Sequence, residues 1–146
     1  MRRRAAPREE DADVKYMIML YGSQQDYDVM AGRPSEKPAM SPEDVAKMHE
    51  YMGEFHQKLA ESGELVDAQG LTAPVHARRV RLKGGVPVVT DGPYAETQEV
   101  LVGYTVVDVV GVDRAIEIAS GLVNPAADGE YVDVRPIVDG IEELSL

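Results

Sequence analysis

The order of predicted elements in this sequence indicates an α+β fold. Two segments carry apolar residues at helical spacing, and each lies between short β-rich runs. Gly84–Gly85 separates two further β-rich runs and is a signal for a two-residue hairpin turn. Without that inserted hairpin the order is βαββαβ, the split-βαβ or ferredoxin-like pattern. It predicts one mainly antiparallel sheet with both helices on one face.

The length of 146 residues suits a single domain with a substantial core. We expect a disordered N-terminal arm over residues 1–14, one domain over residues 15–140 and a short C-terminal tail over residues 141–146. The arm is rich in charges and nearly free of apolar residues, so it cannot bury enough surface to offset its ordering entropy.

The chain has a net charge of −11, which opposes binding to nucleic acids. Its basic clusters are Arg2–Arg4, in the predicted arm, and Arg78–Lys83, whose cations alternate with apolar residues as on the solvated face of a strand. We therefore expect no nucleic-acid partner. No apolar run approaches the roughly 18–20 residues that span a bilayer, and no signal peptide is recognisable. Together with the absence of cysteine, this leads us to expect a cytoplasmic protein without membrane contact.

The first half of the chain should contain one strand and the clearest helix. Lys15–Tyr21 is a short apolar run typical of a buried strand. Gly22–Met40 is a long connection, read either as a mobile surface insertion or as a loop that closes over a ligand. Ser41 is the expected N-cap of the helix, and Gly63 ends it. Its buried stripe consists of Val45, Met48, Met52, Phe55 and Leu59.

The second half should contain another helix and most of the strands. Asp113 is the expected N-cap of this helix, and its apolar face is expected to consist of Ala115, Ile116, Ala119 and Leu122. The strands are expected at Glu64–Leu71, His76–Lys83, Val86–Thr90, Leu101–Val110 and Glu130–Val138.

One face of such a sheet carries no helices and must be covered by something else. The usual solution is a second copy of the chain, packed sheet against sheet about a twofold axis. We therefore expect a C2 homodimer.

Two histidines, His49 and His56, lie on one side of the first helix. They are two turns apart, roughly 10 Å along the axis, which is too far for both to bind one metal ion. We therefore expect no metal site. His49 is the candidate for function, and the alternative for both is a half-buried, hydrogen-bonded histidine at the core boundary.

The run DGPYAETQE at Asp91–Glu99 closely resembles the DGPF motif, commonly DGPFAETKE, of YCII-related (DGPF-domain) proteins. KYMIMLYG, SGELVDAQGL and VDVRPI resemble other segments of the same family, so the resemblance covers about Lys15–Val138. It implies a dimeric α+β barrel of ferredoxin-like subunits with a cleft near the motif. Some relatives have been proposed as small-molecule enzymes that use a His–Asp pair, and some family domains are linked to sigma-factor-type regulators.

The chain departs from the family pattern at three positions. Tyr94 replaces the usual Phe and adds a hydroxyl, and Gln98 replaces the usual Lys and removes a cation. The histidine of the smaller relatives falls near Met52, three residues after His49.

These observations predict a small-molecule site at the DGPYAE loop. Two carboxylates suit acid–base chemistry of a lyase or hydrolase type, and an arginine suits a substrate carboxylate. The catalytic candidates are Asp91, Glu96 and His49, and the ligand-binding candidates are Tyr94, Arg135 and Gln98.

Other interpretations of the same residues remain open, and the sequence does not decide whether the protein is an enzyme. The carboxylates also suit turn hydrogen bonds and surface ion pairs. A ligand-sensing domain or a protein-interaction domain linked to transcription regulation is the alternative function. No GxGxxG or Walker-type pattern is present, so we expect no cofactor.

Overall fold

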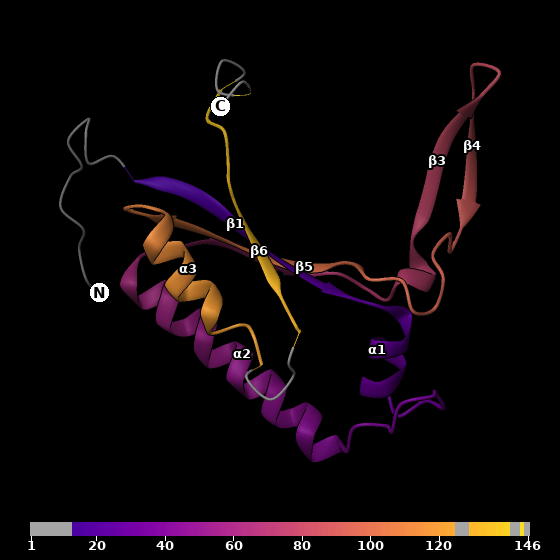
Figure 1. The fold of residues 1–146 in the computed structure, drawn as a ribbon, viewed down its shortest axis with the longest axis horizontal. Helices are drawn as coiled ribbons and strands as arrows, with labels where there is room; N and C mark the ends of the chain where they lie inside the picture. The colour runs from indigo at the N-terminus through magenta and orange to yellow at the C-terminus, as the bar shows by residue number, and fades with distance from the viewer. Residues whose placement is uncertain (1–12, 125–128, 141–143, 145–146) are drawn as a thin grey trace. The chain divides into compact units, whose positions relative to one another are not determined.

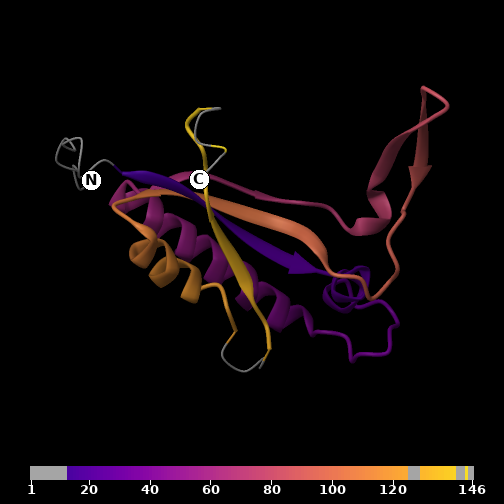
Figure 2. The same cartoon turned by 45° about the horizontal axis from the view of Figure 1, so that its top comes forward.

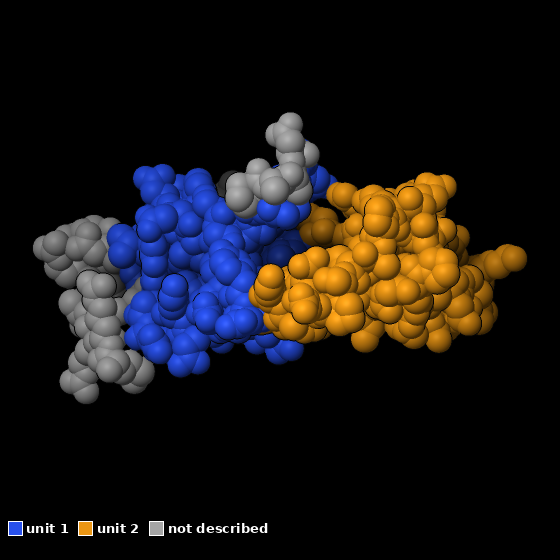
Figure 3. All heavy atoms as spheres, turned by 90° about the horizontal axis from the view of Figure 1, so that it is seen from below, with its two compact units in different colours: residues 1–20, 50–69, 103–146 blue, residues 21–49, 70–102 orange. Residues whose placement is uncertain are grey.

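The computed structural model describes residues 13–124, 129–140 and 144 (Figure 1). Most of the expected N-terminal arm and of the expected C-terminal tail lies outside the described residues. The chain divides into two compact units (Figure 3). Unit 1 contains residues up to 20, residues 50–69 and residues from 103 onward, and unit 2 contains residues 21–49 and 70–102.

A four-stranded sheet has the order β2-β5-β1-β6. In β1 and β6, which run antiparallel, Ile18 lies opposite Val134 and Met17 lies opposite Arg135. This order is compatible with the expected ferredoxin-like α+β fold. The strands are β1 (Val14–Gly22), β2 (Leu65–Gly70), β5 (Val100–Val109) and β6 (Val132–Pro136).

Two helices, α2 (Pro42–Ser62) and α3 (Val112–Ser120), contribute to the core of unit 1. Figure 2 shows α3 and the later part of α2 on the same face of the sheet. This arrangement confirms the prediction that both helices cover one face, because their side chains share one cluster with residues of β1 and β5. The buried members are Tyr16, Ile18, Leu59, Val107, Val109, Ala115, Ile118, Ala119 and Leu122.

Helix α2 begins and ends where the sequence predicts. The Ser41 hydroxyl accepts a hydrogen bond from the backbone N–H of Asp44 at 3.1 Å, which is an N-cap interaction. Gly63 follows the last helical residue with φ 78°, in the left-handed region that favours glycine. The predicted stripe is also correct, since Leu59 is buried and its other members are partly buried.

Helix α3 differs from the prediction in two details. Its N-cap is Gly111, and no side chain caps it, so the assignment of Asp113 as the cap is wrong. Asp113 instead lies in the first turn, where a carboxylate favours the positive end of the helix dipole. Ile116, expected on the apolar face, is half exposed, and Ile118 is buried in the core instead. Residues at spacing i, i+3, i+4 and i+7 form the buried face, namely Ala115, Ile118, Ala119 and Leu122.

The inserted hairpin consists of β3 (Arg78–Lys83) and β4 (Val86–Asp91), which form a separate two-stranded sheet. Gly84 and Gly85 form its turn with φ 59° and 80°, as the Gly-Gly signal predicts. Strand β3 begins later than expected because Pro74–His76 forms a short 3-10 helix, η2.

Residues 22–40 are more ordered than the expected long connection. A seven-residue helix, α1 (Gln24–Met30), occupies its first part. The interpretation of the whole segment as a loop is therefore wrong.

Candidate functional site

The motif begins at the base of the hairpin in unit 2. Asp91 is the last residue of β4, and its Oδ1 lies 3.1 Å from Nε of Arg78 on β3. Gly92 donates its N–H to the carbonyl of Ala77 at 3.0 Å. The Asp91 side chain is 78% exposed, so its ion pair with Arg78 is a solvated one that contributes little stability. Asp91 therefore lies at the base of the hairpin with its carboxylate in solvent.

Tyr94, the residue that replaces the family phenylalanine, is half buried in the motif loop. The guanidinium carbon of Arg79 lies 5.1 Å from the centroid of its ring, which is a cation–π contact. Because Arg79 belongs to β3, this contact links the loop to the hairpin. The Tyr94 hydroxyl makes no hydrogen bond with the described part of the chain.

Helix α1 is held by a capping box at its first turn. The Ser23 hydroxyl accepts the N–H of Asp26 at 3.2 Å, and the Asp26 carboxylate accepts the N–H of Ser23 at 2.8 Å. Ser23 is only 4% exposed. The Ser-x-x-Asp spacing is therefore a sequence signal that identifies the start of this helix.

Three hydrogen bonds then tie α1 to neighbouring segments of unit 2. Gln24 accepts the N–H of Val75 through Oε1 at 2.9 Å, and the Tyr27 hydroxyl donates to the carbonyl of Leu71 at 2.6 Å. Burial raises the pKa of Tyr27 above its usual value. The N–H of Gln25 donates to the carbonyl of Glu96 in the motif loop at 3.1 Å. Helix α1 thus positions both the chain after β2 and the motif.

Gln25 has the most unusual environment in this arrangement. The residue is 6% exposed, yet its carboxamide forms no hydrogen bond with the part of the chain that the structure describes. No described side-chain nitrogen or oxygen is both sealed from solvent and unpaired, so the carboxamide still reaches solvent. A nearly buried amide without a protein partner loses much of its hydration without full compensation. Such a group is available to a ligand.

Four of the six predicted site residues lie on one short segment of unit 2, where they are neighbours in the sequence. Asp91, Glu96 and Gln98 are exposed there, and Tyr94 is half buried. His49, on α2, also belongs to unit 2 and is exposed. Arg135 is exposed on β6 in unit 1, opposite Met17 of β1.

The other helix histidine, His56, makes the better-defined polar contact. In unit 1 its Nδ1 lies 2.9 Å from the carbonyl oxygen of Met52, and its Nε2 lies 3.0 Å from Oγ1 of Thr105. Since a carbonyl can only accept, Nδ1 carries the proton, and in the neutral ring Nε2 accepts from the Thr105 hydroxyl. Thr105 is 1% exposed, so the pair satisfies a buried hydroxyl between helix and sheet. This is a structural role.

Two further polar contacts in unit 1 were not anticipated from the sequence. Arg114 makes a bidentate contact with the buried Glu64, with Nε–Oε2 and Nη2–Oε1 distances of 2.8 and 2.7 Å. The Tyr104 hydroxyl donates to Asp67 at 3.1 Å, and this hydrogen bond, with desolvation and the charge of Asp67, raises the pKa of Tyr104. Both pairs are separated by tens of residues, so no local pattern indicates them.

Metal binding has no candidate in the described residues, where no three His, Asp or Glu side chains gather. None of the helices in this part of the chain is long and apolar enough to cross a membrane.

Comparison with known proteins confirms the resemblance to the YCII-related family. The model of the YCII-related domain matches residues 14–139. The chain belongs to the YCII-related domain family. This YCII-related domain is also 30% identical over 99 residues to a protein of Rhizobium meliloti (strain 1021) called "Uncharacterized protein R00369", and the match covers 68% of this chain and 80% of that one. The family is one of uncharacterised function.

Proposed function

We propose that this YCII-related domain binds a small, polar, uncharged molecule in unit 2, between α1 and the motif loop. The observation that carries the proposal is the carboxamide of Gln25, which is nearly buried and has no partner in the described chain. Around it, the backbone is fixed by the Ser23 cap and by the bond from Gln25 to Glu96. Small-ligand sites are usually largely pre-formed and hold a few precisely placed polar groups.

The chemistry of the carboxamide defines the class of ligand. It offers one acceptor and two donors, so it pairs best with a group that has a donor next to an acceptor, such as an amide or a lactam. The net charge of −11 disfavours an anionic ligand. A neutral amide or lactam meets both conditions.

Binding without chemistry is favoured over acid–base catalysis by the exposure of the predicted catalytic groups. Asp91, Glu96 and His49 all lie in water. Catalytic acids and bases are usually tuned by burial and neighbouring charges, and stabilisation of a transition state is strongest where water is excluded.

Saturation-transfer NMR with a panel of neutral primary amides and lactams tests the proposal. The expected result is transfer to several amides, which is lost in Gln25→Leu and kept in Gln57→Leu, the same change at an exposed position of α2. Transfer to no member of the panel, or equal transfer in both variants, would contradict it.

We further propose that the protein is a C2 homodimer joined by the sheet face opposite the helices in unit 1. The support is the alternation of β2: Leu65 packs against the core, so Val66 points to the other face, where it is 48% exposed. Met17 and Met19 of β1 are also only half buried on that face. An apolar sheet face of this kind needs a cover.

A further inference from the structure

The β3–β4 hairpin has two chemically different faces. In its register Val80 lies opposite Val89 and Leu82 opposite Pro87, and side chains of a strand alternate between faces. These four residues form what we call the apolar face. The other face, here the basic face, carries Arg79, Arg81 and Lys83 with Val86, Val88 and Thr90.

The described chain does not cover the apolar face. Val80, Leu82 and Val89 are 64%, 73% and 59% exposed, and every residue of β4 is exposed. Isolated two-stranded hairpins are marginally stable in water, and contiguous exposed apolar residues mark interaction sites. Both strands are also edges with free backbone groups. The hairpin therefore has the character of an element completed by a partner.

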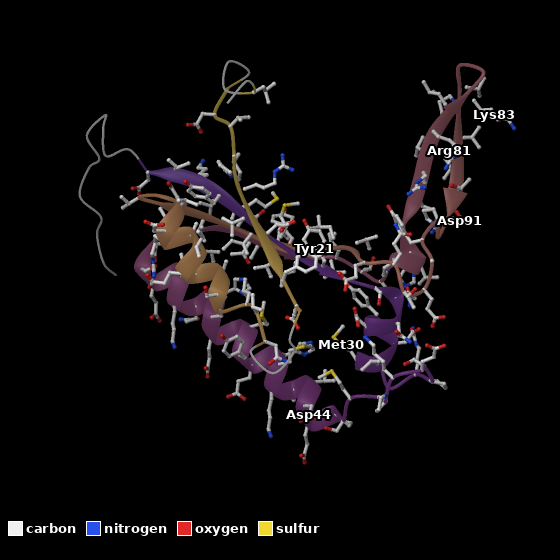
Figure 4. All side chains as sticks on the ribbon, viewed as in Figure 1. Tyr21, Met30, Asp44, Arg81, Lys83 and Asp91 are labelled. Carbon is white, nitrogen blue, oxygen red and sulfur yellow. The ribbon has the colours of Figure 1, made fainter. Side chains whose placement is uncertain are left out.

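The charge of the hairpin indicates which partner fits. It holds four cations and one carboxylate, in a chain whose net charge is −11. Arg78 pairs with Asp91, and Arg79 lies over Tyr94. The side chains of Arg81 and Lys83, labelled in Figure 4, make no ion pair or hydrogen bond with the described residues.

We propose that the β3–β4 hairpin is an arm that docks on the acidic surface of a second copy of this chain. The remainder of the chain carries the excess of carboxylates, so a second copy is electrostatically complementary to Arg81 and Lys83. A nucleic acid would match Arg81 and Lys83 but would leave the apolar face exposed, whereas a protein surface can cover both. The inference concerns a different surface from the amide site, and it rests on the self-association proposed above.

Sedimentation velocity over a range of protein and salt concentrations tests the arm. Arg81→Glu/Lys83→Glu reverses its two unpaired charges, and Lys47→Glu/Lys58→Glu makes the same net change on exposed positions of α2. The dissociation constant of the dimer should rise at least about fivefold in the hairpin variant. It should rise less in the α2 variant, and added salt should narrow the difference between the wild type and the hairpin variant because it screens the charges of the hairpin.

A second variant tests the apolar face without changing charge. Val80→Thr/Leu82→Thr keeps residues that favour strands, so the hairpin should persist in circular dichroism and the dimer should weaken. Equal effects of both charge reversals, or wild-type affinity in the hairpin variants, would overturn the arm. If the hairpin variants keep the wild-type dissociation constant while Val66→Lys, on the sheet face, gives monomers, the dimer proposal stands. Only the docking of the hairpin on a second copy is then contradicted. A wild type that is monomeric throughout overturns both.

Discussion

At the residue scale, the unpaired carboxamide of Gln25 makes a prediction about stability. Leu has nearly the volume and helix propensity of Gln but no polar group to desolvate. Gln25→Leu should therefore raise the free energy of unfolding by about 1 kcal/mol, the lower end of the cost of an unpaired buried group, because the amide still reaches solvent. Urea titration measures this change.

The matched control is Gln98→Leu at an exposed position, which should alter the free energy of unfolding by no more than about 0.5 kcal/mol. A loss of stability in Gln25→Leu would mean that the carboxamide has a structural partner, and the argument for a ligand would fail.

The Tyr104–Asp67 pair predicts a pH dependence at the alkaline end. The folded pKa of Tyr104 is raised, chiefly by its hydrogen bond to Asp67, so the folded state holds that proton more tightly than the unfolded state. The pair's contribution is complete below the usual tyrosine pKa of about 10 and is lost as the pH rises through the higher folded value.

Urea unfolding at a series of pH values from about 8 to 11 measures this contribution in the window around the tyrosine pKa. In Asp67→Asn the alkaline loss of stability should be smaller than in the wild type, because one source of the raised pKa is gone. Glu36→Gln neutralises an exposed carboxylate and should leave the loss unchanged. Equal losses in Asp67→Asn and the wild type would contradict the assignment.

The sequence predicts which candidate residues share one segment, but it does not predict which residues tertiary contacts bury. Asp91, Tyr94, Glu96 and Gln98 lie together because one short segment carries them. The environment of Gln25 depends on tertiary contacts, such as the hydrogen bond from its N–H to the carbonyl of Glu96. The residues next to Gln25 in the sequence do not indicate such contacts. The sequence likewise does not indicate the contact of His56 with Thr105, because the two residues lie 49 positions apart.

At the element scale, α1 is the short helix that positions the motif loop. Its capping box predicts that Ser23→Ala costs about 1 kcal/mol of stability and loosens the bond from the Gln25 N–H to Glu96. Hydrogen exchange at the Gln25 amide should therefore be faster in the variant.

Ser41→Ala provides a matched control, because it removes the N-cap bond of α2 instead. It should cost a similar free energy but accelerate exchange at Gln25 only as far as global stability falls. The same exchange rate at Gln25 in both variants would show that the α1 cap does not support the motif loop.

Elements with strong local signals are predictable, and those fixed by tertiary contacts are less so. Ser41, Pro42 and Gly63 define α2, and Gly84–Gly85 defines the hairpin turn. Helix α1 is short and lies in a segment rich in glycine and proline. That composition is typical of a loop, so it outweighs the capping box of Ser23 and Asp26 as a sequence signal. Helix α3 begins after Gly111, which has no side chain to cap it, so the sequence carries no capping signal there.

At the scale of the whole molecule, the order of elements is enough to predict the α+β fold and a sheet with two helices on one face. Connection rules leave few arrangements for a βαββαβ chain, and β2-β5-β1-β6 is one of them. Association between chains is a property of surfaces, which local patterns do not determine. The dimer therefore remains a prediction.

Light scattering should give a mass of twice 16.0 kDa for the wild type at micromolar concentration. Val66→Lys places a charge on the proposed sheet interface and should give a folded monomer, whereas Val112→Lys changes an equally exposed valine on α3 and should leave the dimer intact. A wild-type monomer, or the same outcome for both variants, would contradict the sheet interface.

The most direct measurement for the central claim is the side-chain NH₂ signal of Gln25 in a nitrogen-15 NMR spectrum, assigned by its loss in Gln25→Leu. Benzamide offers a donor beside an acceptor, and benzoate has the same shape but only acceptors and a negative charge. Titration with benzamide should shift the Gln25 signal progressively to saturation, and benzoate should leave it in place. No shift with benzamide, or the same shift with both compounds, would contradict an amide-binding site at Gln25.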